Sequence, residues 1–351
     1  MIPQNFIRHK VRPSDSLTSL AKRINLSEND LKEFHNQNCG KMDKLWVTNL
    51  RGIEVVLIPT HFIIEKEYEL QQRKMLPTES YFANFHLNKY SVEECFEQPE
   101  KEDLKFNYII NLNIHEKNGS FVSTIDLKDF TKNSNTPDDK ISSLSLGCMK
   151  SLYPISFQLS DDGSIHSCFE HQKVIEKFWS KRNDIEDFYI GEISKKYLDT
   201  FAQNISDEDY FLQQIQSNWL YQILFPNLKW FHHKTFWNEK FFIYRNSFPI
   251  EFEFKTENQY EDIYHIETIL TGKIIENYSL RGLLKGIRIE DEDPENLIEA
   301  EIEIHYFTDR ISKQLIEVKS SVSIWFLNEL FQKHNLHITQ NNDENLPHTT
   351  K

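Results

Sequence analysis

Residues 9–36, HKVRPSDSLTSLAKRINLSENDLKEFHN, contain the pattern that decides the fold of the N-terminal part. A strand-like run ends at Val11, and Pro13 breaks it. Asp15 or Ser16 can then cap a helix, because a short polar side chain accepts a hydrogen bond from a free N–H group at a helix start. Apolar residues follow at helical spacing, at Leu17, Leu20, Ala21 and Ile24.

A second helix and a closing strand complete this N-terminal pattern. Ser27 is a capping residue for a helix that passes through Leu31 and ends near Asn36. Residues 53–59, IEVVLIP, are apolar and β-branched and end in proline, which is typical of a strand end. The sequence therefore predicts the order strand, helix, helix, strand for residues 1–60.

These N-terminal residues resemble the LysM family over residues 6–60. The matching positions are Val11, Pro13, Asp15, Leu17, Leu20, Ala21, Leu31, Asn36, Ile58 and Pro59. The sequence departs from the family at Ser14, where glycine is usual, at Ser16, where threonine is usual, and in an enlarged segment after Asn36. The resemblance implies a βααβ module.

The resemblance also implies where a ligand would bind. In sugar-binding LysM members, two loops contact N-acetylated glycans, and these loops correspond to residues 13–17 and to the segment after Asn36. A side chain at Ser14 would hinder the close approach that glycine allows. Trp46 could stack on a pyranose ring, or it could fill the core of the enlarged loop together with Leu45. The resemblance gives as candidate ligand-binding residues Ser14, Asp15, Ser16, Leu17, Asn36 and Trp46.

The rest of the chain predicts a larger domain of antiparallel sheet with an inserted helical segment, so the fold class is α+β. We expect irregular sequence up to about Lys101 and then a hairpin at Asn118-Gly119, because this dipeptide favours a tight turn between alternating runs. A second hairpin turns at residues 161–163, DDG. Residues 61–168 are therefore expected to be rich in strands.

Residues 169–340 are predicted to begin with helices and to end with strands, and they can form one domain with residues 61–168. The third expected helix is capped at Ser206-Asp207 and is stopped by Pro226. Apolar residues alternate with Glu and Ser along residues 298–324, which predicts an antiparallel pair with one wet face. The polar residues 341–351 are expected to form a disordered tail.

No local pattern predicts catalysis or metal binding. Adjacent His232 and His233 would point to opposite faces of a strand, so one metal ion could not bind both. The alternating residues Glu299, Glu301 and Glu303 are typical of a solvated strand face. Since no nucleophile or phosphate-loop motif occurs, we predict that the protein is not an enzyme, with no catalytic residue, metal or cofactor.

Charge and hydropathy limit the expected partners. The chain has 40 basic and 54 acidic residues and a net charge of −14. An acidic body repels phosphate groups, so we expect neither nucleic-acid binding nor membrane insertion. The four cysteines form no CxxC pair, and no stretch looks like an export signal or a membrane span. These features predict a cytoplasmic protein.

Two functions remain in competition, with a third behind them. The first is a LysM-containing adaptor or assembly protein of a bacterial contractile injection apparatus, such as type VI secretion or a phage-tail-like particle, because LysM-like modules occur in such machines. Its partner would be a secretion or tail component or an effector. The alternative is a protein that binds peptidoglycan or another N-acetylglucosamine polymer. A cell-wall hydrolase ranks third.

Overall fold

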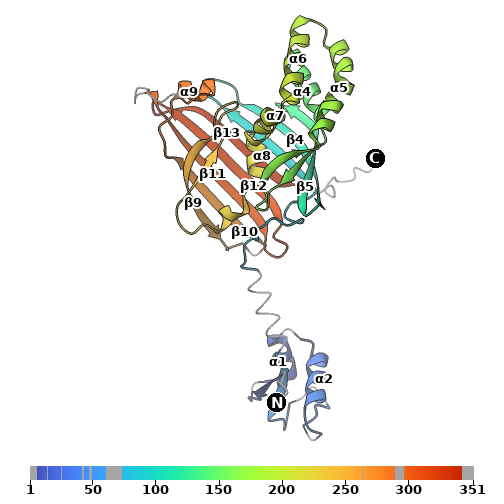
Figure 1. Cartoon of the computed structure of the whole chain (residues 1–351). Helices are drawn as coiled ribbons and strands as arrows, with labels where there is room; N and C mark the ends of the chain where they lie inside the picture. The colour runs from blue at the N-terminus through green and yellow to red at the C-terminus, as the bar shows by residue number, and fades with distance from the viewer. Residues whose placement is uncertain are drawn as a thin grey trace, which may run out of the picture. The chain divides into compact units, whose positions relative to one another are not determined.

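The computed structural model consists of two compact units, Met1–Met75 and Leu76–Lys351 (Figure 1). It describes residues 6–13, 15–24, 26–41, 43–46, 50–60, 73–262, 264–288 and 296–341. Residues 342–351 of the expected tail lie outside the described residues.

The N-terminal unit has the order strand, helix, helix, strand. Its elements are β1 (Phe6–Lys10), α1 (Leu17–Arg23), α2 (Glu28–Asn38) and β2 (Val55–Pro59). The two strands pair antiparallel, with Phe6 opposite Pro59 and Lys10 opposite Val55. Ser16, and not Asp15, caps α1, because its side chain accepts a hydrogen bond from the backbone N–H of Ser19.

A small apolar core holds this unit together. The two helices bury one stripe each against the strands, because helices this short are marginal without tertiary packing. The buried residues are Leu17, Leu20, Ala21, Leu31, Leu45, Leu50, Val56 and Ile58.

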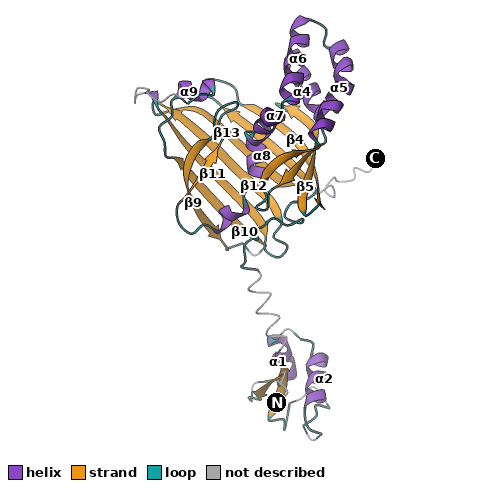
Figure 2. Cartoon of the chain, viewed as in Figure 1, coloured by secondary structure: helices purple, strands orange, loops and turns teal. Residues whose placement is uncertain are grey.

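The second unit is mixed helix and sheet and is built on one large antiparallel sheet (Figure 2). The described residues place eleven strands in it, in the order β7-β6-β5-β4-β3-β13-β12-β11-β10-β9-β8. The strands are β3 (Lys89–Glu97), β4 (Leu104–Lys117), β5 (Ser120–Lys132), β6 (Ile155–Leu159), β7 (Ile165–Phe169), β8 (Trp237–Phe241), β9 (Ile250–Gln259), β10 (His265–Ile274), β11 (Ile298–Asp309), β12 (Leu315–Phe326) and β13 (Glu329–Gln340).

This order joins two consecutive meanders along a single seam. Strands β3 to β7 form the first meander and β8 to β13 the second, and β3 pairs with β13 between them. Residues from the predicted segments 61–168 and 169–340 therefore share one sheet. The expectation of irregular sequence up to Lys101 is wrong, because β3 lies within it.

The predicted hairpins are both present. Lys117 of β4 lies opposite Ser120 of β5, so Asn118 and Gly119 alone form the turn. Both have positive φ, 54° and 79°, as a type I′ turn requires. The second hairpin joins β6 to β7 around Gly163, where φ is +98°.

The helices of the second unit are α4 (Lys140–Leu152), α5 (His171–Phe188), α6 (Glu192–Ser206), α7 (Glu208–Gln216), α8 (Trp219–Leu224), the 3-10 helix η1 (Leu228–His232) and α9 (Leu280–Lys285). The third predicted helix is in fact two, because α7 ends at Gln216 and Asn218 then caps α8 with its own side chain. α8 packs on the sheet, where the indole Nε1 of Trp219 donates to Ser320 Oγ at 3.0 Å. In Figures 1 and 2, α7 and α8 lie over one face of the sheet, while α4, α5 and α6 project beyond it.

Candidate functional site

An anchored loop of the N-terminal unit presents Trp46. Asn36, near the end of α2, holds this loop with both ends of its side-chain amide: Nδ2 donates to the Leu45 carbonyl at 2.9 Å, and Oδ1 accepts from the Leu45 N–H at 2.7 Å. Leu45 is only 2% exposed and fixes the loop in the core, whereas the adjacent Trp46 is 79% exposed. The alternative that both side chains are buried holds for Leu45 and is wrong for Trp46.

Two further contacts hold the same loop. Lys32 Nζ donates to the carbonyl of Trp46 at 2.9 Å. The buried His35 accepts from the N–H of Leu57 at its Nδ1 atom, so Nε2 carries the proton and donates to the carbonyl of Asp43 at 2.8 Å. The exposed indole therefore projects from a backbone that α2 and β2 hold in place. Sequence reasoning did not single out Lys32 or His35.

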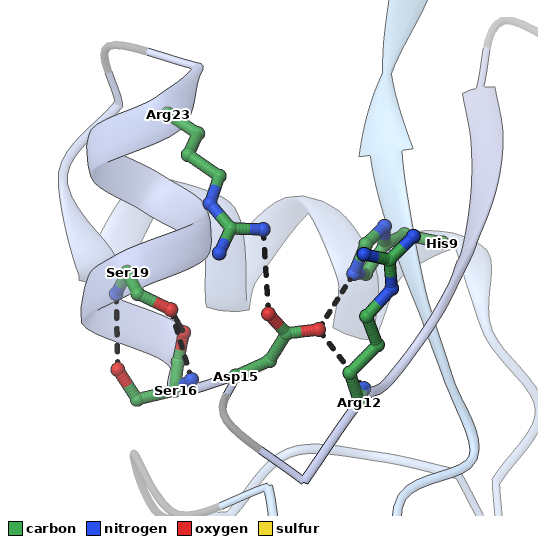
Figure 3. A network of polar contacts seen from close by, with 6 residues as sticks. All are labelled: His9, Arg12, Asp15, Ser16, Ser19 and Arg23. Carbon is green, nitrogen blue, oxygen red and sulfur yellow. Dashed lines mark hydrogen bonds and ion pairs between the residues drawn. The ribbon is translucent and has the colours of Figure 1, made fainter.

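Asp15 faces its own chain (Figure 3). Its Oδ2 atom accepts from His9 Nε2 and from the backbone N–H of Arg12, each at 2.9 Å, and Arg23 Nη1 lies 3.3 Å from Oδ1. The side chain has no exposed surface. The hydrogen bond from His9, then that from Arg12, lowers the pKa of Asp15 below its usual value, with the charge of Arg23 adding to this against the effect of burial. The carboxylate therefore braces the loop between β1 and α1.

The other residues of this loop are also used internally. Ser16 and Ser19 form a reciprocal capping box (Figure 3). Leu17 is 0% exposed, so its side chain belongs to the core and is closed to a ligand. Ser14 lies outside the described residues.

The structure thus brings Asn36 and Trp46 together through Leu45. Among the described residues, no polar or ring contact joins Trp46 to Asp15, Ser16 or Leu17. Of the predicted site residues that are described, Trp46 alone presents a large exposed apolar side chain. An exposed indole on an anchored backbone can stack on a sugar ring or fill a pocket of a protein partner.

The second unit has a broad groove of about 670 Å³ on its polar sheet face. His305 lies there between two carboxylates, with Nδ1 2.7 Å from Glu267 Oε1 and Nε2 3.0 Å from Glu303 Oε1. Glu301 pairs with Lys273 at 2.7 Å. In the predicted glutamate ladder, Glu301 is therefore engaged in a cross-strand pair and Glu303 pairs with His305 of its own strand, as on an ordinary solvated sheet face.

A buried polar cluster lies on the opposite face, at the seam between the meanders. Glu94 of β3 accepts hydrogen bonds from the Tyr108 hydroxyl of β4 and, at 2.9 Å, from His334 Nε2 of β13. Phe96 stacks on the His334 ring at a centroid distance of 3.9 Å. Because each partner comes from a different strand, the cluster fixes the register of the seam.

The histidine pair is placed differently from the prediction. His232 ends η1 instead of lying in a strand, and its Nε2 atom is 2.7 Å from the carbonyl of Pro77. His233 stacks on Trp237 at a centroid distance of 4.5 Å. Within the described ranges, no group of three His, Cys, Asp or Glu side chains is arranged to hold a metal ion.

No described helix is both long enough and apolar enough to cross a membrane. The four cysteines are free thiols, and burial raises the pKa of Cys148 to about 11.

Comparison with models of known protein families and with curated proteins finds no match to this chain.

Proposed function

We propose that the chain is a non-enzymatic adaptor whose N-terminal unit is a LysM-like module that binds a protein partner through Trp46. The carrying observation is the 79% exposure of an indole on a backbone that Asn36 and Lys32 hold in place. Exposed tryptophan on a preorganised surface is favoured at protein interfaces, because its large area is buried at small cost in side-chain entropy. A component of a contractile injection apparatus or phage-tail-like particle, or its effector, is the class of partner we propose.

The loop that begins α1 supports a protein partner over a sugar. In the LysM resemblance this loop would share glycan binding with the segment after Asn36. Here the Asp15 carboxylate and the Ser16 hydroxyl are engaged by their own chain, and Leu17 is buried. A sugar would therefore find an aromatic platform at Trp46 with few free polar groups from the other loop.

Binding of a polymer of N-acetylglucosamine is the alternative function, and the same indole favours it. The flat face of an exposed tryptophan suits the apolar face of a pyranose ring. Both functions thus depend on Trp46. Removal of the indole would weaken binding of the protein partner in the first function and binding of the glycan in the second.

The test uses the full chain with Trp46→Ala and Trp46→Phe. An aromatic photo-crosslinking amino acid at position 46, which keeps a ring there as Trp46→Phe does, identifies the partner in cells, with the same group at exposed Lys22 as the matched control. Calorimetry then measures affinity for that purified partner and for chitooligosaccharide and muropeptide. We expect Trp46→Ala to weaken partner binding about tenfold or more, since losing a buried ring costs at least about 1.4 kcal/mol.

The outcomes separate the two functions. Trp46→Phe should retain most of the affinity, because it keeps an aromatic face. Micromolar binding of chitooligosaccharide that Trp46→Ala abolishes would replace the adaptor by the glycan-binding alternative. Partner affinity unchanged in Trp46→Ala would contradict the role assigned to the indole.

A further inference from the structure

Four large apolar side chains are exposed at the end of the projecting helices of the second unit. Phe188 ends α5, Ile190 lies in the connection, Ile193 is in the first turn of α6, and Ile141 is in the first turn of α4. They are 79%, 78%, 86% and 75% exposed, respectively. Lys140 Nζ donates to the carbonyl of Ile190 at 2.8 Å, which places the start of α4 beside the α5–α6 connection. We call these four residues the helical tip.

The helical tip is not needed to close the core. α5 already buries Val174 and Phe178, and α6 buries Leu198 and Ala202 along a separate stripe. Single exposed apolar residues are common, but several gathered at one place mark an interaction surface. Figure 1 shows α4, α5 and α6 standing clear of the sheet.

A groove of about 390 Å³ continues from the tip between α4 and α5. Phe188 and Ile185 line one wall, Tyr189 lies nearby, and Gly147 lines the opposite side. A Cβ at Gly147 would be 3.9 Å from the Tyr189 ring, an ordinary contact, so helix packing does not require glycine there. Glycine inside a helix is unfavourable relative to alanine, and here it keeps the groove open.

Two unpaired cations line this groove. Lys150 and Lys181 are exposed, and neither has a carboxylate within ion-pair distance among the described residues. By contrast, the neighbouring Arg182 pairs with Asp199 and Glu186. Asp184 is the one acidic side chain among the groove-lining residues. The groove is therefore apolar with an excess of positive charge.

We propose that the helical tip and this groove dock an amphipathic helix of a partner protein, with acidic residues flanking its apolar face. The apolar face would lie against Phe188 and over Gly147, and the acidic residues would face Lys150 and Lys181. The inference rests on the proposed adaptor function, which needs a second docking surface.

The test measures binding of two synthetic helical peptides to the full chain by fluorescence anisotropy. The peptides share one apolar face and carry glutamate or lysine on the polar face. We expect the acidic peptide to bind at least tenfold more tightly, and added salt to reduce this difference. Lys150→Glu with Lys181→Glu should reverse the preference.

Three variants locate the site. Gly147→Leu fills the groove, and the double variant Phe188→Ser with Ile190→Ser removes apolar side chains of the tip. Each of these two variants should weaken binding of the acidic peptide at least tenfold. Ile311→Ser, a matched control, removes an apolar side chain that is 70% exposed elsewhere in the same unit, and it should change nothing. Circular dichroism checks that each variant is folded.

Several results would overturn the inference. They are equal affinity for both peptides, an equal loss in Ile311→Ser, self-association that Phe188→Ser abolishes, or flotation with phosphatidylglycerol vesicles that depends on Phe188. Trp46→Ala should leave peptide binding unchanged, because Trp46 belongs to the other unit. Failure of the helical tip is thus distinguishable from failure of the Trp46 surface.

Discussion

Replacing Asn36 by alanine tests whether this residue couples the fold of the N-terminal unit to the Trp46 surface. The change removes both hydrogen bonds to the Leu45 backbone. Each such bond contributes about 0.5–1.5 kcal/mol, so about 1–3 kcal/mol is lost. Alanine is the better helix former within α2 and offsets about 0.5 kcal/mol. We therefore expect the free energy of unfolding of this unit to fall by about 0.5–2.5 kcal/mol.

Hydrogen exchange of the full chain, read by mass spectrometry, measures this loss directly. Peptides from residues 26–46 should lose protection about 2- to 60-fold, since 1.4 kcal/mol corresponds to one decade. Gln37→Ala is the matched control, because that side chain is exposed and its one hydrogen bond to a described residue is to Glu33 Oε1, at 3.2 Å. Unchanged protection in Asn36→Ala, or an equal loss in Gln37→Ala, would refute the coupling.

Two predictions concern the large sheet. Gly272→Ala should lower the free energy of unfolding by about 1–3 kcal/mol in urea, because its Cβ would lie 2.4 Å from the Phe254 ring; an unchanged midpoint would contradict this. Burial lowers the pKa of His305, but hydrogen bonds to Glu267 and Glu303 outweigh it and raise the pKa above 6.5. Protonated His305 therefore stabilises the fold fully below pH 6.5, and this stabilisation is lost as pH rises through the raised pKa. The difference in free energy of unfolding between wild type and His305→Asn should therefore shrink as pH rises through the pKa of His305. A difference that stays constant with pH would contradict the link between His305 protonation and stability.

Local patterns predicted the elements whose determinants are close in sequence. Asn118 and Gly119 supply the positive φ angles of their turn by themselves. Ser27 caps α2 by accepting a hydrogen bond from the backbone N–H of Asp30, only three residues later. The strand β3 could not be predicted in this way. Glu94 lies on its inner face beside Val92, where an apolar residue is expected, and its partner His334 is 240 residues away.

The helix α4 shows a different reason for a missed element. Its sequence, KISSLSLGCMKSL, is rich in serine and contains glycine, which are weak helix formers. Yet Leu144, Cys148 and Leu152 are buried at a spacing of four, and Asp139 caps the start. The apolar stripe was therefore the usable signal, and tertiary packing outweighed the low propensity.

The candidate site depends on a choice that the sequence left open between two adjacent apolar residues. Leu45 and Trp46 point to different environments because Asn36 holds the Leu45 backbone against α2, and only the leucine enters the core. If the indole is the binding surface, two kinds of variant must act differently. Trp46→Ala should reduce binding and leave stability nearly unchanged, since that side chain buries little. Asn36→Ala should reduce both, because it loosens the backbone that presents the ring.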